Sequence, residues 1–525
     1  MSSHLFPSAV HTMMIPLTAL NWTHLYAIGA IVFLFFWTAQ RPARRKLPYP
    51  PGPPAKDWIS GNARELLADK LHFTFINWGK IYGPIFHLKS FNTHILVINS
   101  FEDAVEIMEK RSNNYSDRPY IPMIDLVGWT FNSAFKPYGP TWQAHRRALH
   151  QTFNQKASVK YRPLQIDKMN DMLHGFLETP EDFMAHIKTV ASAVIMSAMY
   201  GYDVSPKDDY FTNLAEEGMS AMSRSYNPGA SIVNVLPILR HLPTWFPGAE
   251  FHRVAKVALA TVTQMQEIPY KFVRDSMAAG TASPSFVADN IEGCKTEADH
   301  KLLKEVAATG YGAPNPKTAA SITTFIYAMA LRPDVQKRAQ EEIDRVIGQD
   351  RLANFDDEAS LPYIRAICQE VLRWRPVLPL CVFHASVAED VYKGYYIPKG
   401  IVHTDLRAQA MTRDPDRYDN PEDFNPDRYM TADKLSKDDI TYTFGFGRRI
   451  CPGMHLASAS LWLAVVTTLS AFDIRPPKDA GASGNEIPLE DIEYTGGLLS
   501  HASPFKCSIT PRSDRTRELI LDLKN

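Results

Sequence analysis

The pattern of apolar and polar positions separates an apolar N-terminal segment from a long globular body. The first forty residues contain no Asp, Glu, Lys or Arg, and residues 20–39 are mostly apolar. About 20 apolar residues are enough for a helix to cross a bilayer. A basic cluster follows at 41–46, which suits an uncleaved anchor with a cytosolic C-terminal side better than a cleaved signal peptide. We therefore predict a lumenal N-terminus and a single membrane anchor over residues 1–40.

A proline-rich linker joins this anchor to the body. Residues 47–54 include five prolines. Because proline fixes φ and lacks an N–H, this stretch is expected to be a stiff, extended spacer. We place a basic and proline-rich linker at 41–58. No repeat or low-complexity stretch interrupts residues 60–510, so a single large domain is predicted at 59–525.

Periodicity within the body predicts a mainly α fold with small β regions. Short runs at 83–88 and 94–98 read as strands, and helical periodicity dominates from about 101 to 347. An amphipathic helix is also predicted at 362–373, and short strands return near 391–397. This distribution favours one mainly helical domain over several small ones.

Charge and cysteine usage narrow the functional classes. The net charge of −1 and the lack of a long basic run give no reason to expect a nucleic-acid partner. The five cysteines are scattered and form no C-x-x-C pair. That pattern argues against a disulfide framework or a zinc site and favours a reducing compartment.

One cysteine lies in a distinctive setting. Residues 444–453 read Phe-Gly-Phe-Gly-Arg-Arg-Ile-Cys-Pro-Gly, and an apolar helical stretch begins directly afterwards. A cysteine beside arginines and near a helix N-terminus favours the thiolate form. Thiolate is a charged, electron-donating ligand for iron. Taken alone, such a cysteine could also be a small buried loop residue, since cysteine is often buried.

The complete loop resembles the haem-binding loop of the cytochrome P450 family. The family pattern F-x-x-G-x-R-x-C-x-G is met at Phe444, Gly447, Arg449, Cys451 and Gly453. The resemblance implies haem b (iron protoporphyrin IX) with Cys451 as its axial metal ligand. It also implies that Phe444, Gly447, Arg449 and Gly453 belong to the cofactor-binding loop.

Further motifs of the family occur in the expected order. Glu370 and Arg373 resemble the family's E-x-x-R, and three-residue spacing puts both side chains on one helix face. The resemblance implies a structural lock of these two residues with Arg428, which supports the cysteine loop. Trp142 and Arg146 are similar to the family's W-x-x-x-R. By the same resemblance, these two residues, Arg449 and His384 are candidates for binding the haem propionates.

The segment 313–322 departs from the family pattern. In the family, an acid and an alcohol at this point deliver protons to iron-bound dioxygen. Alignment on residues 322–325 puts Pro316 and Lys317 in their places, and Thr318 survives one position late. A proline in a helix interior costs about 3 kcal/mol. Thr318 and Asn315 are therefore the candidate catalytic residues for a shifted proton relay.

The resemblance implies a membrane-bound monooxygenase of the endoplasmic reticulum with a cytosolic catalytic domain. It would hydroxylate or epoxidise a hydrophobic small molecule, in the manner of fungal secondary-metabolism enzymes. Since no dinucleotide-binding glycine fingerprint follows a strand, NADPH–cytochrome P450 reductase is the expected electron donor, with cytochrome b5 as a further partner. The altered segment leaves alternatives open: an isomerase or dehydratase, a peroxide-using enzyme, or a haem protein without turnover.

The substrate pocket is expected to have apolar walls. Four segments are predicted to contribute them: 121–131, 313–318, 377–383 and 497–499. Such walls suit a hydrophobic ligand that could enter from the lipid.

Overall fold

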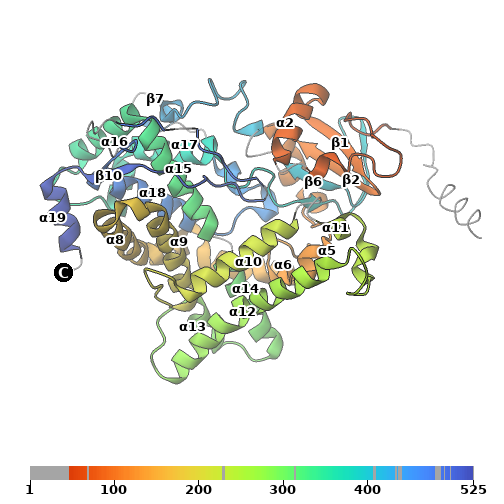
Figure 1. Ribbon diagram of the computed structural model, residues 1–525, viewed down its shortest axis with the longest axis horizontal. Coiled ribbons are helices and arrows are strands. Elements are labelled where there is room, and N and C mark those ends of the chain that lie inside the picture. The colour runs from red at the N-terminus through yellow and green to blue at the C-terminus, as the bar shows by residue number, and fades with distance from the viewer. Residues whose placement is uncertain are drawn as a thin grey trace, which may run out of the picture. The chain divides into compact units, whose positions relative to one another are not determined.

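The computed structural model describes residues 47–67, 70–226, 231–312, 315–405, 410–431, 434–435, 440–478, 486–489, 491–496 and 498–523 (Figure 1). The predicted anchor at 1–40 lies outside the described residues, as does the basic part of the linker at 41–46. Two described helices, Pro180–Tyr200 and Met454–Ala471, are long and apolar enough to span a membrane. Because 67% and 72% of their apolar windows are buried inside the protein, these two are core helices.

Contacts divide the chain into two units. One comprises Met1–Tyr49 with Val391–Tyr396, and the other comprises Pro50–Asp390 with Ile397–Asn525. In the described part of the small unit, the N–H of Tyr396 donates to the carbonyl oxygen of Pro48 at 2.8 Å. The candidate motifs of the cysteine loop and of the helices all lie in the large unit.

The large unit contains a four-stranded sheet in the order β1-β2-β6-β3. Strands β1 (Ile85–Ser90) and β2 (Thr93–Ile98) form an antiparallel pair, which confirms the two strands predicted from the sequence. Strand β6 (Val402–Asp405) runs parallel to β2. Strand β3 (His384–Ala385) pairs with β6 in antiparallel register, which sets His384 opposite His403.

Smaller strand pairs complete the β structure. They are β4 (Asp390–Tyr392) with β5 (Tyr395–Ile397), β7 (Met430–Thr431) with β8 (Lys434–Leu435), and β9 (Phe472–Arg475) with β10 (Ser508–Pro511). The strands predicted near 391–397 correspond to β4 and β5.

Helices make up most of the rest, as the periodicity predicts. The longer ones are α2 (Leu71–Tyr82), α6 (Pro140–Phe153), α8 (Arg162–Glu178), α9 (Phe183–Tyr200), α10 (Tyr210–Tyr226), α12 (Glu250–Ala278), α14 (Glu297–Gly312), α15 (Asn315–Leu331), α16 (Pro333–Val346), α17 (Pro362–Trp374), α18 (Met454–Ala471) and α19 (Asp514–Asp522). Short helices include α3 (Phe101–Ala104), α4 (Ser112–Tyr115), α5 (Pro122–Leu126), α7 (Gln155–Ser158), α11 (Ile232–Val235) and α13 (Phe286–Ile291).

The core of the large unit forms around helices that are apolar on nearly every face. Most residues of α9 and α18 are buried, as expected for helices without a polar stripe. Helix α18 packs against α8, α15, α16 and α17, and α9 packs against α8, α14 and α15. By contrast, α16 and α17 are amphipathic and bury one face each. This packing holds α15 and α18 next to each other beside the cysteine loop.

The helical segment around 313–316 is described only in part. Helix α14 is described up to Gly312 and α15 from Asn315 onward, while Ala313 and Pro314 lie outside the described residues. The predicted cost of proline in this segment therefore stays a prediction.

Candidate functional site

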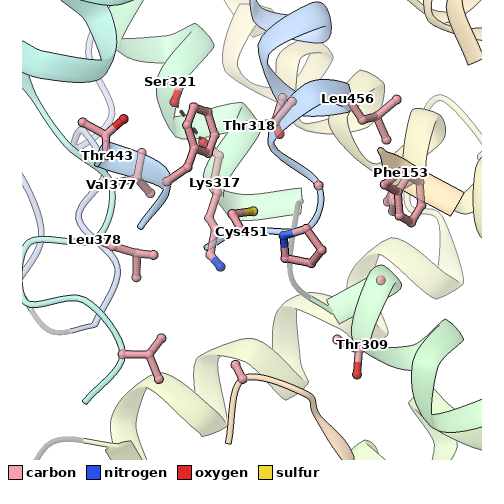
Figure 2. A pocket seen from close by; sticks show the side chains of 18 of the residues that line it. Phe153, Thr309, Lys317, Thr318, Ser321, Val377, Leu378, Thr443, Cys451 and Leu456 are labelled. Carbon is pink, nitrogen blue, oxygen red and sulfur yellow. Dashed lines mark hydrogen bonds between the residues drawn. The ribbon is translucent and has the colours of Figure 1, made fainter. Parts of the chain in front are cut away.

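A large cavity lies between the cysteine loop and the central helices (Figure 2). Its lining comes from α6, α9, α14, α15, the segment after α17, and the loop that precedes α18. The cavity volume is about 290 Å³, close to the lower end of the roughly 300–1,000 Å³ that small-molecule pockets usually measure.

The cysteine loop forms one wall of the cavity. It contains two 3₁₀ turns, Thr441–Phe444 and Gly447–Arg449, and ends where α18 begins at Met454. The N–H of Cys451 donates to the carbonyl oxygen of Phe444 at 2.8 Å, which closes the loop on itself. Cys451 is partly buried and lines the cavity, together with Phe444, Arg449 and Gly453.

Gly447 permits the backbone conformation of the cysteine loop. It does not belong to the cavity lining, and its φ is +54°. A Cβ at this position would collide with the carbonyl oxygen of Met108. Because glycine alone adopts this backbone without strain and fits this contact, Gly447 allows the loop to approach the segment before α4.

Partly buried arginines lie on one side of the cavity. The guanidinium of Arg449 donates to the carbonyl oxygens of Ser116, Ser133 and Lys136 at 2.9, 3.1 and 2.9 Å. It also lies over the Trp142 ring, 4.2 Å from the centroid. Arg146, one turn along α6 from Trp142, donates to the carbonyl oxygen of Ile450 at 2.5 Å.

The positive charges of this arginine cluster favour an anionic ligand. Burial lowers the pKa of Arg146, and burial together with the nearby Arg118 guanidinium lowers the pKa of Arg449. Among the described residues that line the cavity, none is Asp or Glu. Arginines pair well with carboxylates, so the two propionates of haem suit this cluster of partly buried cations. This donor set fits the cofactor.

A second group on the lining was not found from the sequence. The buried side chains of Cys381, His384 and Asp405 bring their ligand atoms within 4.8 Å of one another. Cys381 and His384 line the cavity, and the His384 ring stacks on His403 with centroids 5.2 Å apart. Only the pairing of β3 with β6 brings Asp405 and His403 to His384, and no local motif signals this pairing.

The structure brings the three predicted lock residues together outside the cavity. Glu370 and Arg373 have fully buried side chains, with Nε of Arg373 2.7 Å from Oε2 of Glu370. Nε of Arg428 lies 3.2 Å from the same carboxylate. Arg373 also donates to the carbonyl oxygens of Thr412 and Pro421 at 2.8 and 2.7 Å. The cluster thereby ties α17 to the coil on the way to the cysteine loop.

The two candidate proton-relay residues differ in what the structure describes of them. Thr318 lines the cavity, whereas the side chain of Asn315 lies outside the described part of the chain. Lys317 and Ser321 line it as well, and Figure 2 shows the Lys317 side chain extending into the cavity near Cys451. Burial lowers the pKa of the Lys317 ammonium, while the charge of Cys451 acts in the opposite direction.

A group of polar side chains adjoins the cavity at Ser133. Oγ of Ser133, a lining residue, lies 3.1 Å from Nδ1 of His145. Nε2 of His145 lies 3.2 Å from Glu305, and Nζ of Lys136 lies 2.9 Å from the same carboxylate. Burial lowers the pKa of His145. Burial raises the pKa of Glu305, but the nearby His145 and Lys136 outweigh it and lower that pKa overall. This group links α6 to α14 and was not found from the sequence.

The predicted pocket walls are only partly correct. Val377, Leu378 and Val382 line the cavity as expected. The segment 121–131 does not, because its apolar side chains such as Met123, Trp129 and Phe131 pack in the core, and the lining begins at the next residues, 132–134. Leu498 is also a core residue, and Gly497 lies outside the described residues.

Comparisons with a family model and with known proteins agree on one family. A model of the cytochrome P450 family matches residues 50–506. Cytochrome P450 monooxygenase 208 of Postia placenta is 37% identical over 94% of this chain and 96% of its own length. Cytochrome P450 monooxygenase COX1 of Coprinopsis cinerea is 36% identical over 94% of this chain and 98% of its own length. Cytochrome P450 monooxygenase ppsD of Aspergillus oryzae is 37% identical over 90% of both chains.

Proposed function

The chain belongs to the cytochrome P450 family and is an oxidoreductase that uses haem with a cysteine thiolate as axial ligand; on that premise we propose that it is a membrane-bound monooxygenase of a hydrophobic small molecule in secondary metabolism. The observation that carries this proposal is the cavity itself. It combines a loop cysteine, a cluster of partly buried cations and mostly apolar walls in one space. The proposed reaction is hydroxylation or epoxidation of an unreactive carbon.

Two cysteines line the cavity, and Cys451 is the proposed ligand of iron. It occupies the cysteine position of the family loop and lies just before the N-terminus of α18. Cys381 instead has a buried thiol that donates to the carbonyl oxygen of Val382 at 3.3 Å, and it lies beside the Asp405 carboxylate. A neighbouring negative charge disfavours a second one, so Cys381 is the weaker candidate.

The remaining site residues divide into holding and shaping roles. We assign Trp142, Arg146, His384 and Arg449 to the propionates, and Phe444, Gly447 and Gly453 to the shape of the cysteine loop. The lock of Glu370, Arg373 and Arg428 positions that loop from behind. When bound, haem supplies an iron that activates dioxygen with two electrons.

Protons for this chemistry must come from residues other than the usual acid and alcohol. Thr318 is the proposed hydroxyl for the relay because it lines the cavity from α15, with Asn315 as its proposed neighbour. Ser133 offers a second hydroxyl, connected through His145 to Glu305. These groups would hold and pass protons within the cavity while its apolar walls exclude bulk water.

The surroundings of the enzyme follow from the same proposal. We place the anchor at residues 1–40, the linker at 41–58 and the catalytic domain at 59–525. The anchor would hold the protein in the endoplasmic reticulum membrane with the catalytic domain in the cytosol. NADPH–cytochrome P450 reductase would supply the electrons, with cytochrome b5 as a second donor.

Spectroscopy and labelling test the proposal in order. Reduced protein in microsomes with carbon monoxide should give the absorption band of a thiolate-bound haem, and Cys451→Ser should lose it while Cys381→Ser keeps it. Reductase, NADPH and labelled dioxygen with a panel of apolar compounds should then give labelled product. Turnover without reductase would instead indicate an isomerase, a dehydratase or a peroxide-using enzyme. Absence of turnover with every compound would leave a haem protein without catalysis.

A further inference from the structure

The cavity holds more positive charge than the cofactor can balance. Five described lining residues are cationic, and none is acidic: Arg118, Arg146, Lys317, Arg375 and Arg449. Ferric iron, the porphyrin ring and a thiolate together are neutral, so a bound haem contributes only the negative charges of its two propionates. Part of the positive charge therefore needs another partner, because an unpaired charge in an apolar environment is costly.

The arginines have partners within the protein. Arg118 donates to the carbonyl oxygens of Val382 and Phe383, both at 2.6 Å. Arg375 lies 4.0 Å from the carboxylate of Glu422. The bonds of Arg146 and Arg449 to main-chain carbonyls fix these two guanidiniums on the side assigned to the propionates.

Lys317 differs from these four cations. Within the part of the chain that the structure describes, its ammonium takes part in no hydrogen bond or ion pair. Among the described residues, Cys451 is the group whose charge acts on the Lys317 ammonium, and iron would take up that charge once haem is bound. In Figure 2 its side chain extends into the cavity past Leu378 and Cys451.

The surroundings of this ammonium define what it can bind. Apolar side chains such as Val377, Leu378 and Ile322 form the nearby lining, so a ligand must present an anion on an otherwise apolar body. A single ammonium is a point charge without the fork of an arginine. One such charge matches a singly charged carboxylate better than a phosphate, which carries more charge.

We propose that Lys317 binds the carboxylate of an apolar carboxylic acid that is the substrate of this enzyme. The proposal rests on the proposed function and adds the substrate class to it. The carboxylate pairs with the ammonium at the start of α15, and the apolar body of the acid occupies the rest of the cavity. The chain then accepts acids and discriminates against their esters, because an ester leaves the ammonium unpaired.

Binding to the haem-loaded, full-length protein tests this proposal. The probes are three acids, each compared with its methyl ester: dodecanoate, abietate and biphenylacetate. Calorimetry and the haem absorption shift should show a preference for at least one acid of about ten-fold or more, equivalent to about 1.4 kcal/mol. Lys317→Gln should abolish the preference and Lys317→Arg should keep it. Lys337→Gln, at a lysine with a side chain 79% exposed on α16, should leave it unchanged.

The outcomes separate this proposal from the proposed function. A normal carbon monoxide band with no acid preference in any of the three pairs overturns the role of Lys317 and leaves the monooxygenase standing. The same holds if Lys317→Gln keeps the preference. A shift of the ligand-free ferric absorption band in Lys317→Gln would show that the amine coordinates iron, which also overturns it. Absence of the thiolate-haem band in folded protein would refute the proposed function itself.

Discussion

Glu370→Gln is expected to destabilise the protein strongly, although it changes neither the size nor the shape of the side chain. The carboxylate is fully buried and lies 2.7 Å from Arg373 and 3.2 Å from Arg428. It also accepts a hydrogen bond from the N–H of Asn425 at 2.7 Å. An amide leaves the buried Arg373 charge uncompensated, and breaking a buried pair in this way costs about 3–5 kcal/mol.

The chain offers a matched control for this substitution. Glu250 and Arg253 form another E-x-x-R pair at 3.7 Å, but their side chains are 81–83% exposed. Exposed ion pairs contribute at most about 1 kcal/mol, so Glu250→Gln should be nearly neutral. Urea unfolding followed by tryptophan fluorescence measures the free energy of unfolding of both variants.

The comparison has a clear negative outcome. If Glu370→Gln loses no more stability than Glu250→Gln, the buried cluster is not a structural lock. If Glu370→Gln fails to accumulate as folded protein, Arg373→Met provides the second measurement. Since it removes the unpaired cation and leaves an apolar side chain of similar length, the double variant with Glu370→Gln should be more stable than Glu370→Gln alone.

Three further predictions concern the cofactor site, the loop and acid stability. Arg146→Ala should weaken haem retention, measured as the rate of haem transfer to apomyoglobin, and Arg146→Lys should restore part of it; equal rates in all three proteins would refute the assignment. Gly447→Ala should lower the free energy of unfolding by about 1–3 kcal/mol, because of the positive φ at this position and the collision of a Cβ with a main-chain carbonyl. Gly139→Ala is the control and should cost far less, because Gly139 has an extended φ of 175° and open space around it. Burial, with a smaller effect of nearby arginines, lowers the pKa of His72 to about 4 and that of His403 to about 3. Below about pH 6.5, the two histidines are therefore neutral in the folded protein but bind a proton in the unfolded chain. The free energy of unfolding should therefore be independent of these histidines above pH 6.5. Between pH 6.5 and 4 it should fall by about 1.4 kcal/mol per pH unit for each histidine. In His72→Gln, this pH dependence should correspond to about one proton fewer.

The features predicted correctly from the sequence are those with a short-range signal. The strands β1 and β2 and the helices α16 and α17 each show apolar periodicity within a few residues. The spacing of Glu370 and Arg373 fixes their pairing within one helix turn. Arg428 is 58 residues from Glu370, and only the family resemblance, not local periodicity, connected it to the pair.

The features missed depend on contacts between distant segments. Ser133, His145 and Glu305 become neighbours only because α6 packs against α14. The segment 121–131 has the apolar composition of a pocket wall, but composition does not distinguish a side chain that faces a cavity from one that faces the core. Trp129 is fully buried in that core. Burial direction is set by the packing of α5 against α10 and α12, which no periodicity within 121–131 encodes.

The altered segment at 315–318 changes the charge of the cavity wall. Lys317 and Thr318 both line the cavity from α15. A hydroxyl is thus still present beside a new cation. Loss of the usual acid removes a negative charge from this wall, and the lysine adds a positive one. A substrate carboxylate paired with Lys317 would restore the balance of charge on this wall, which connects the departure from the family pattern to the choice of substrate.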